Sequence, residues 1–300
     1  MRLLLKILGG ALLLGVLLLL VFLIPAHLQI RSVEPGVPTR PELRELLGAS
    51  DGPVRLRYVN TSSQRLPTGE LGHTVFVVEW ANGDLFMIDA GMDVPTAIKF
   101  GRLVETTLGA GEATSHGTIS DLLGEAVARV EGVAFTHLHI DHTQGIVPFC
   151  AARGKGATLF QTTWQTDLQN FNTTEAEEII ESSCLSRNGI GSEGLISVDG
   201  FPGLGVAALG GHSPGSTLFA IAVGGHLWIL SGDIANSKAD LVSDTGKGFL
   251  YSYVMVPENT GRTEMLRGWL TGLDAESDMT VLVAHDLTDI RESGLAEYQR

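Results

Sequence analysis

The chain has 300 residues, of which 44% are hydrophobic and 18% are charged, and its formal net charge at pH 7 is −14. This acidic balance, without any run rich in lysine and arginine, repels nucleic-acid phosphates and argues against a DNA or RNA partner. Two cysteines, Cys150 and Cys184, are too few for a disulfide framework, and they form either one disulfide or two buried free thiols.

The N-terminal segment is a long apolar run. After Arg2 and Lys6 no charged residue occurs from Ile7 through Ile24, which is 18 residues and near the minimum for a helix that crosses a bilayer. A signal peptide would have a shorter apolar region and a better cleavage site than "LIPAHL" offers. We therefore expect an uncleaved, single-pass membrane anchor.

The charges around this run predict its orientation. Arg2 and Lys6 place the N-terminus in the cytoplasm and the bulk of the chain on the extracytoplasmic (periplasmic) side, although the arginines at 31, 40 and 44 weaken that prediction. Residues 1–24 are the predicted anchor. Five prolines between positions 25 and 53 predict a tether. Residues 54–300 are long enough for one large domain.

Within this domain short apolar runs alternate with helical patterns. "HTVFVVEW" and "LFMID" flank an Asn-Gly turn signal and predict a β-hairpin. The later elements, in chain order, are helices at 94–109 and 118–130, the strand "GVAFTHLH", the helix "GIVPFCAAR", the strand "ATLFQ", two helices within 163–186, the strands "LISV", "VAALG", "TLFAIAV" and "HLWILSG", a helix at 262–276 and the strand "MTVLVAHD". Two successive batches of strands and helices indicate a layered α/β fold with more than one sheet.

The segment "FTHLHIDHTQG" carries the strongest chemical signal. It places His137, His139, Asp141 and His142 within six consecutive positions after an apolar strand. In extended backbone the first two point to one face, and a turn brings the other two toward the same point. Because imidazoles and carboxylates are costly to bury unpaired, the cluster indicates a metal site. Zinc suits these ligands best, with iron or manganese as alternatives.

Three further ligand types follow apolar strands. His212 comes after "VAALGG", Asp233 after "HLWILSG" and His285 after "MTVLVA". Each alone is equally well explained as a loop-edge residue, but together they repeat the placement of the first cluster. In this order "THLHIDHTQG", "GGHSPGS", "SGD" and "AHD" resemble the metallo-β-lactamase-fold hydrolases over roughly residues 54–290.

The resemblance implies a four-layer αββα sandwich with two divalent metal ions at one edge. Its implied ligands are His137, His139 and His212 for one metal, Asp141, His142 and His285 for the other, and Asp233 as the bridge. Asp89 in "FMIDAG" matches the acidic residue that supports the ligands in this family. A helix N-cap or a turn residue is the alternative reading of Asp89.

The implied reaction is hydrolysis of a small-molecule ester, lactone, thioester or lactam. Two divalent metals would lower the pKa of a bridging water and supply hydroxide as the nucleophile, and Asp141 would relay a proton. Phosphoester or phosphotriester hydrolysis is the alternative on the same site. Asp233 stands where many β-lactamases of this fold carry cysteine, and Asn236 stands where many lactonases carry tyrosine, so the substrate is left open.

Aromatic residues on two segments are candidates for a substrate pocket. They would suit an apolar substrate, although aromatic residues in such runs are more often core residues. The candidates are Trp164, Phe171, Phe249, Tyr251 and Tyr253, with His116 as an additional polar one. His73 and His226 lack ligand-like neighbours in sequence and are expected to be ordinary histidines.

Two other functions fit parts of the sequence. "GHSPG" matches the nucleophile-elbow pattern of serine hydrolases through Ser213, but Pro214 precedes strand-like residues where that motif needs a helix. We therefore expect Ser213 to support the loop around His212. A non-catalytic metal-binding module is disfavoured because every expected ligand position is filled. "GIGSEG" matches a dinucleotide-binding pattern but also lacks the helix that would follow it.

Overall fold

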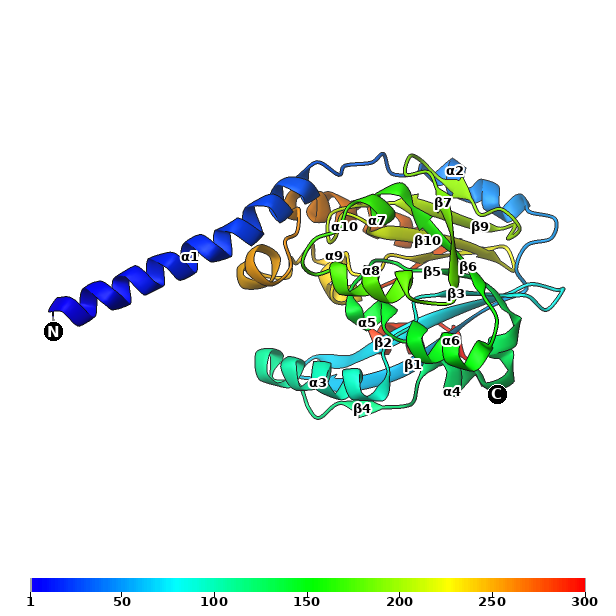
Figure 1. Cartoon of the computed structure of the whole chain (residues 1–300). Helices are drawn as coiled ribbons and strands as arrows, with labels where there is room; N and C mark the ends of the chain where they lie inside the picture. Colours follow the sequence, from blue (N-terminus) through cyan, green and yellow to red (C-terminus); the bar gives the residue numbers. More distant parts are fainter. Residues whose placement is uncertain (1, 300) are drawn as a thin grey trace.

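The computed structural model describes residues 2–299 and contains two β-sheets packed face to face between outer helices. A long N-terminal helix, α1 (Arg2–Arg31), projects away from this sandwich (Figure 1). The predicted αββα architecture is confirmed.

The first sheet has eight strands, in the order β13-β1-β2-β3-β5-β6-β7, with β4 paired to β1. Their bounds are β1 Arg55–Leu66, β2 Gly69–Glu79, β3 Leu85–Ile88, β4 Thr114–Ser115, β5 Val130–Ala134, β6 Ala157–Thr162, β7 Leu185–Ile190 and β13 Ala296–Glu297. β2 and β3 form the predicted hairpin. β3, β5, β6 and β7 are parallel, so their carboxyl ends meet at one edge of the sheet.

The second sheet has five strands, in the order β12-β11-β10-β9-β8. Their bounds are β8 Ile196–Ser197, β9 Leu204–Ala208, β10 Thr217–Val223, β11 His226–Leu230 and β12 Met279–Leu282. β10 is antiparallel to β9 and β11, and β11 is parallel to β12. The carboxyl ends of β9, β11 and β12 therefore lie at the same edge.

Alternating side chains build the core between the two sheets. Phe76 and Phe86 from the first sheet meet Phe219 and Leu230 from the second, and each is at most 1% exposed. Helices cover the two outer faces with their apolar stripes. They are α4 (Ile119–Leu123), α6 (Ile146–Arg153) and α8 (Thr174–Glu181) on the first sheet, and α2 (Arg40–Glu45) and α10 (Thr260–Asp274) on the second.

The remaining helical segments lie in the connections between these elements, and several of them also add residues to the cores. They are η1 (Leu46–Gly48), α3 (Val94–Leu108), η2 (Gly124–Arg129), α5 (Ile140–Thr143), α7 (Thr163–Asp167), α9 (Lys238–Val242), the π-helical turn η3 (Tyr251–Met255) and α11 (Leu287–Glu292). The segment predicted as two helices over 163–186 contains α7 and α8, and α8 ends at Glu181. A disulfide between Cys150 and Cys184 joins α6 to the start of β7, which answers the question that the sequence left open.

The region predicted as a proline-rich tether packs against the domain over part of its length. α1 continues through Pro25 to Arg31, and the side chains of Ile30, Val33 and Leu43 are at most 1% exposed. Their apolar surface is buried because the domain offers a matching face. α1 is long and apolar enough to cross a membrane over Leu5–Arg31, where mean hydropathy reaches 3.1 and 6% of the most apolar window is buried.

Candidate metal centre

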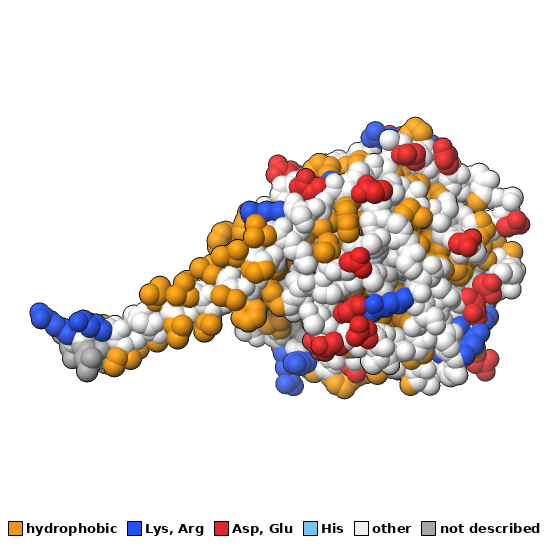
Figure 2. Space-filling model, turned by 45° about the horizontal axis from the view of Figure 1, so that its top comes forward, with side chains coloured by type: hydrophobic (Ala, Val, Ile, Leu, Met, Phe, Trp, Pro, Cys, Tyr) orange, Lys and Arg blue, Asp and Glu red, His pale blue; other side chains and the backbone are white. Residues whose placement is uncertain are grey.

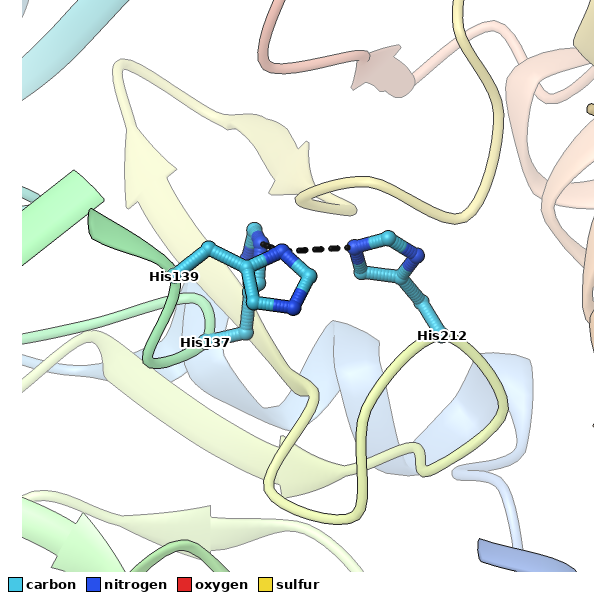
Figure 3. Close-up of side chains that lie close together, drawn as sticks. All are labelled: His137, His139 and His212. Carbon is cyan, nitrogen blue, oxygen red and sulfur yellow. Dashed lines mark hydrogen bonds between the residues drawn. The ribbon is translucent and has the colours of Figure 1, made fainter. Parts of the chain in front are cut away.

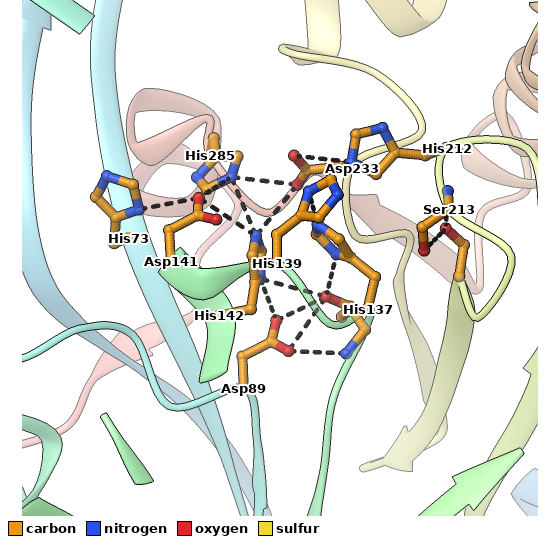
Figure 4. Close-up of polar contacts among 12 residues, drawn as sticks. His73, Asp89, His137, His139, Asp141, His142, His212, Ser213, Asp233 and His285 are labelled. Carbon is orange, nitrogen blue, oxygen red and sulfur yellow. Dashed lines mark hydrogen bonds and ion pairs between the residues drawn. The ribbon is translucent and has the colours of Figure 1, made fainter. Parts of the chain in front are cut away.

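All seven predicted ligands lie together at one edge of the sandwich, where strand ends of both sheets meet (Figure 4). The first sheet contributes His137 and His139 after β5, and Asp141 and His142 on α5. The second sheet contributes His212 after β9, Asp233 after β11 and His285 after β12. The parallel directions of these strands explain why residues distant in sequence converge.

Two glycines allow the close approaches that shape the centre. A Cβ on Gly145, just after α5, would lie 2.0 Å from the carbonyl oxygen of Ala90, so only glycine lets α5 pack against the loop after β3. Gly211 has a φ of 85°, in the left-handed region that favours glycine, and it turns the chain immediately before His212.

Three imidazoles form a first cluster (Figure 3). His139 Nδ1 lies 3.0 Å from His137 Nε2 and 3.2 Å from His212 Nε2. Asp233 Oδ2 lies 3.7 Å from His212 Nε2. His137 and His212 are each 1% exposed and His139 is partly buried, so their ring nitrogens face one another with little access to bulk water.

A second cluster lies on the other side of Asp233. The second carboxylate oxygen, Oδ1, is 3.2 Å from His285 Nε2 and 3.6 Å from His142 Nε2. His285 Nε2 is also 3.3 Å from Asp141 Oδ2. The two oxygens of Asp233 thus face two different groups of ligands, which is the arrangement that a bridging carboxylate needs.

The donor set fits metal ions. Neighbouring ligand atoms of a tetrahedral zinc ion are separated by roughly 3.3 Å, given metal–ligand bonds of about 2.0–2.1 Å. The observed separations of 3.0 to 3.7 Å fall around this value. Ligand atoms of His137, His139 and His212 all lie within 4.8 Å of one another, as do those of His137, His142 and Asp233.

Hydrogen bonds at the opposite ring nitrogens fix four of the five imidazoles. His142 Nδ1 donates to Asp89 over 3.0 Å, and His212 Nδ1 donates to Glu258 over 2.6 Å. His285 Nδ1 donates to the carbonyl of Gly72, and His137 Nδ1 contacts Thr136 Oγ1. Each contact engages the far nitrogen, so Nε2 is the ring atom directed into the centre.

Asp89 holds more than one group in place. It also accepts hydrogen bonds from the backbone N–H and the hydroxyl of Thr136, at 2.7 Å and 2.9 to 3.1 Å. The N-cap of α3 is Asp93, so the N-cap reading of Asp89 is wrong. Its φ of 64° is unusual for a residue other than glycine, and such strain is common at functional sites.

Burial keeps the first cluster neutral. It lowers the pKa of His137 well below its ordinary value, and the neighbouring imidazoles of His142 and His139 lower it further. Burial likewise lowers the pKa of His139 to about 3, with His212 adding to the effect. Neutral imidazoles bind a metal ion without first releasing a proton.

The second cluster is strongly ionised. Burial alone would raise the pKa of Asp141, but His142 and His285 outweigh it and hold the pKa well below its ordinary range. Burial would lower the pKa of His285, yet Asp233 and Asp141 raise it well above its ordinary value. In the metal-free protein His285 therefore carries a proton at neutral pH, in the place where a metal would bind.

Sequence analysis did not identify three residues at the centre, which are Lys247, Glu258 and His73. Lys247 has a side chain 3% exposed, with Nζ 3.6 Å from Asp233 and 3.8 Å from Glu258. Its pKa is raised, against the effect of burial, by Tyr251, Asp233 and Glu258. His73, expected to be an ordinary histidine, is buried with Nδ1 3.5 Å from Asp141 Oδ2.

The pocket candidates separate into different environments. Tyr251 stacks on the ring of His212, with centroids 6.5 Å apart and an interplanar angle of 12°. Phe249 and Phe171 are exposed, at 74% and 43%. His116 is exposed and contacts Ser63, apart from the ligands.

The other sequence candidates make local contacts. Trp164 is half-buried, and its backbone N–H donates to Ser192. Tyr253 contacts Thr260 through its hydroxyl. Ser213 bonds to Ser216 within its own loop, and strand β10 rather than a helix follows it, so the serine-hydrolase alternative lacks its structural context.

The sequence matches the family model of the metallo-beta-lactamase superfamily over residues 68–285. The chain belongs to this superfamily. With its His/Asp clusters, it is a metal-dependent hydrolase of the metallo-β-lactamase fold, as predicted. A search of curated proteins gave no match.

Several solved structures share the fold of this metallo-β-lactamase superfamily member. An N-acyl homoserine lactone hydrolase, with N-hexanoyl-L-homoserine bound at its catalytic metal center, is 16% identical with a TM-score of 0.58, covering 80% of this chain and 96% of that one. B. thuringiensis AiiA, in a mutant form with N-decanoyl-L-homoserine bound, is 15% identical with a TM-score of 0.59, covering 80% and 96%. The hydrolase AbOPH is 15% identical with a TM-score of 0.53, covering 77% and 86%.

Proposed function

We propose that this protein is a dinuclear metal-dependent hydrolase that cleaves an ester, lactone, thioester or lactam of a small molecule. The main support is that the two oxygens of Asp233 face two separate groups of buried ligands, 3.7 Å and 3.2 Å away. The proposed ligands are His137, His139 and His212 for one ion, Asp141, His142 and His285 for the other, and Asp233 for both. Zinc is the proposed metal because the donors are imidazole nitrogens and carboxylate oxygens.

The bound ions would supply Lewis acidity that polarises a carbonyl group and lowers the pKa of water. The chain's own residues orient and charge the site. Asp89 and Glu258 hold the imidazoles of His142 and His212 in one orientation. Asp141 is the proposed proton acceptor. Lys247 places a buried positive charge beside Asp233, where it can stabilise negative charge that develops on the substrate.

The acyl substrates are favoured by the nature of the structural relatives. Two of those reported above carry acyl-homoserine molecules, according to their descriptions. Asn236 occupies the place where a tyrosine is common in lactonases, but Tyr251 approaches the first cluster from another segment and stacks on His212. Phosphoester hydrolysis remains the second candidate, because the same ligand set supports attack on a phosphoryl group.

We propose that α1 anchors the enzyme in a membrane with the catalytic domain on the extracytoplasmic side. The support is the apolar character of Leu5–Arg31 and the basic residues Arg2 and Lys6 before its uncharged part. The disulfide between Cys150 and Cys184 agrees with an oxidising compartment.

Metal analysis and a substrate panel test this proposal. We expect about two divalent ions per chain and hydrolysis of at least one lactone, thioester, aryl ester or β-lactam. His139→Ala should lower both metal content and activity, the latter by more than about 100-fold, because it removes a ligand of the first cluster. His226→Ala is the matched control, since His226 lies on β11 and contacts Thr280. A metal-loaded protein that hydrolyses only phosphoesters would favour the second candidate, and one inert toward the whole panel would refute both.

A further inference from the structure

The last turns of α1 are fixed to the domain. Ala26 and Ile30 are 4% and 0% exposed. His27 Nε2 donates to the backbone carbonyl of Tyr253 over 3.1 Å, and Gln29 Nε2 donates to that of Gln169. The helix therefore enters the domain without a flexible linker. If α1 spans a bilayer, the surface around these contacts lies at the bilayer surface.

Exposed apolar side chains surround this junction. Phe249 and Leu250 are 74% and 64% exposed, and Phe171 and Met255 are 43% and 38% exposed. We call these four residues the apolar collar. Phe249 stacks on Tyr253 at 5.0 Å, which links the collar to α1 through His27. In Figure 2 hydrophobic side chains continue from α1 onto the adjoining surface of the domain.

The two segments of the collar are joined to each other. Asn172, next to Phe171, donates through Nδ2 to the carbonyl of Met255 over 2.9 Å. Isolated apolar residues are common on protein surfaces, but a contiguous group beside an apolar helix indicates an interaction surface. Its continuity with α1 identifies the partner as a lipid bilayer rather than another protein.

The segment that carries the collar also lines the metal centre. Tyr251, the residue after Leu250, stacks on His212. Ser252 donates to Glu258, which holds His212 in turn. The collar is thus less than one helical turn from groups that contact the ligands, so this edge of the metal centre faces the proposed bilayer.

A second apolar element flanks the centre from the opposite side. Phe100 of α3 meets the ring of His73 edge-on at 5.2 Å. Val94 and Ile98 of α3 are 38% and 41% exposed, and α3 lies on the side of the domain from which α1 projects (Figure 1). Lys99 and Arg102 are exposed on α3, which also carries Glu105 and is capped by Asp93, so this helix offers two basic side chains to anionic lipid headgroups without a large net charge.

We infer that the apolar collar enters the bilayer interface and that the metal centre receives its substrate from the membrane. The substrate class is an amphiphilic acyl ester or lactone whose hydrocarbon chain partitions into the bilayer. Its hydrolysis adds water across the acyl C–O bond and gives a carboxylic acid and an alcohol, or a single hydroxy acid from a lactone. This inference rests on the proposed function for the hydrolysis and on α1 as the anchor.

The first experiment measures docking without depending on catalysis. Full-length Phe249→Trp protein is reconstituted in phospholipid nanodiscs that contain lipids with a bromine on the acyl chain. We expect the bromine to quench the fluorescence of the introduced tryptophan, which is obtained by subtracting the signal of the parent protein. Val147→Trp is the control, because Val147 is 51% exposed on α6, away from α1. Equal fluorescence of Phe249→Trp with brominated and ordinary lipids would overturn the docking.

The second experiment compares two acyl chain lengths. We measure the rate of hydrolysis of a hexadecanoyl ester in the bilayer and divide it by the rate for a soluble butanoyl ester. The double variant Leu250→Asp/Met255→Asp should lower this ratio by about ten-fold, because it places charges on the surface that enters the bilayer. The control Val54→Asp/Val147→Asp carries the same charges at exposed apolar positions elsewhere and should leave the ratio unchanged. An unchanged ratio in the collar variant would overturn delivery from the membrane. Failure of the parent protein to hydrolyse either ester would instead count against the proposed function, while the quenching result would still decide the docking.

Discussion

Glu258 is the residue on which the orientation of His212 depends. It is 3% exposed and accepts from His212 Nδ1, while Ser252 and Lys247 contact its carboxylate as well. Burial would raise its pKa, but His212 and Lys247 hold the pKa below its ordinary value. The carboxylate therefore stays charged, and it increases the basicity of the imidazole that faces the metal centre.

Glu258→Gln tests this role. The amide keeps the shape of the side chain and can still accept a hydrogen bond from His212, but it removes the charge. We expect metal affinity to fall by about 10- to 100-fold, measured by competition with a chromophoric chelator. Glu264→Gln on the exposed face of the same region, in α10, is the control and should leave affinity unchanged. Equal affinities for both variants would show that Glu258 only packs against His212.

The sequence reveals the ligands, which follow apolar strands, and misses supporting residues that do not. His212, Asp233 and His285 each come directly after an apolar run, so their placement at a sheet edge is readable. Lys247 and Glu258 lie in the irregular connection between α9 and α10, where no periodicity indicates which way a side chain points. His73 lies within β2, where seven consecutive residues are buried, so no alternation indicates that its side chain faces the centre.

At the scale of elements, strand β7 was not predicted, because its composition is not that of a typical strand. β7, with the sequence LSRNGI, is largely exposed and polar at the edge of its sheet, so it lacks the apolar pattern of a strand. It forms because β6 offers it a parallel partner over six residue pairs. In the segment predicted as a tether, over 25–53, Ile30, Val33 and Leu43 are at most 1% exposed, although its many prolines give little sign of such packing.

The disulfide stabilises the elements around β7. Cys150 on α6 and Cys184 before β7 are 34 residues apart, so the bond restricts a loop of this length in the unfolded chain. We expect Cys150→Ser/Cys184→Ser to lower the free energy of unfolding by about 3 kcal/mol, measured by urea denaturation. A reducing agent should destabilise the parent protein to a similar extent and leave the double variant unaffected. A parent protein insensitive to reduction would contradict the assigned bond.

At the scale of the whole molecule, the metal centre joins the two sheets. His137 and His142 come from the first sheet, and His212, Asp233 and His285 come from the second. Apart from the apolar core between the sheets, the centre is where charged groups of both meet. In the absence of metal, the ion pairs of His285 with Asp141 and Asp233 contribute this link, and they require a proton on His285.

Removal of metal should therefore destabilise the fold in a pH-dependent way. A free ion at a thousand times its dissociation constant stabilises the folded state by about 4 kcal/mol, which raises Tm by about 10 °C in a domain of this size.

In stripped protein the pKa of His285 is raised above its ordinary value of 6.5. The stability that His285 contributes is therefore full below that pH and is lost as pH rises through the folded-state pKa. Metal-bound His285 holds no proton on Nε2, so its contribution does not change in that range. We expect the difference in Tm between loaded and chelated protein to widen as pH rises above the ordinary His pKa of 6.5 toward the raised folded-state value, measured by calorimetry. His285→Ala should remove that widening, whereas His226→Ala should retain it, and a Tm difference independent of pH in the parent protein would contradict the role given to His285.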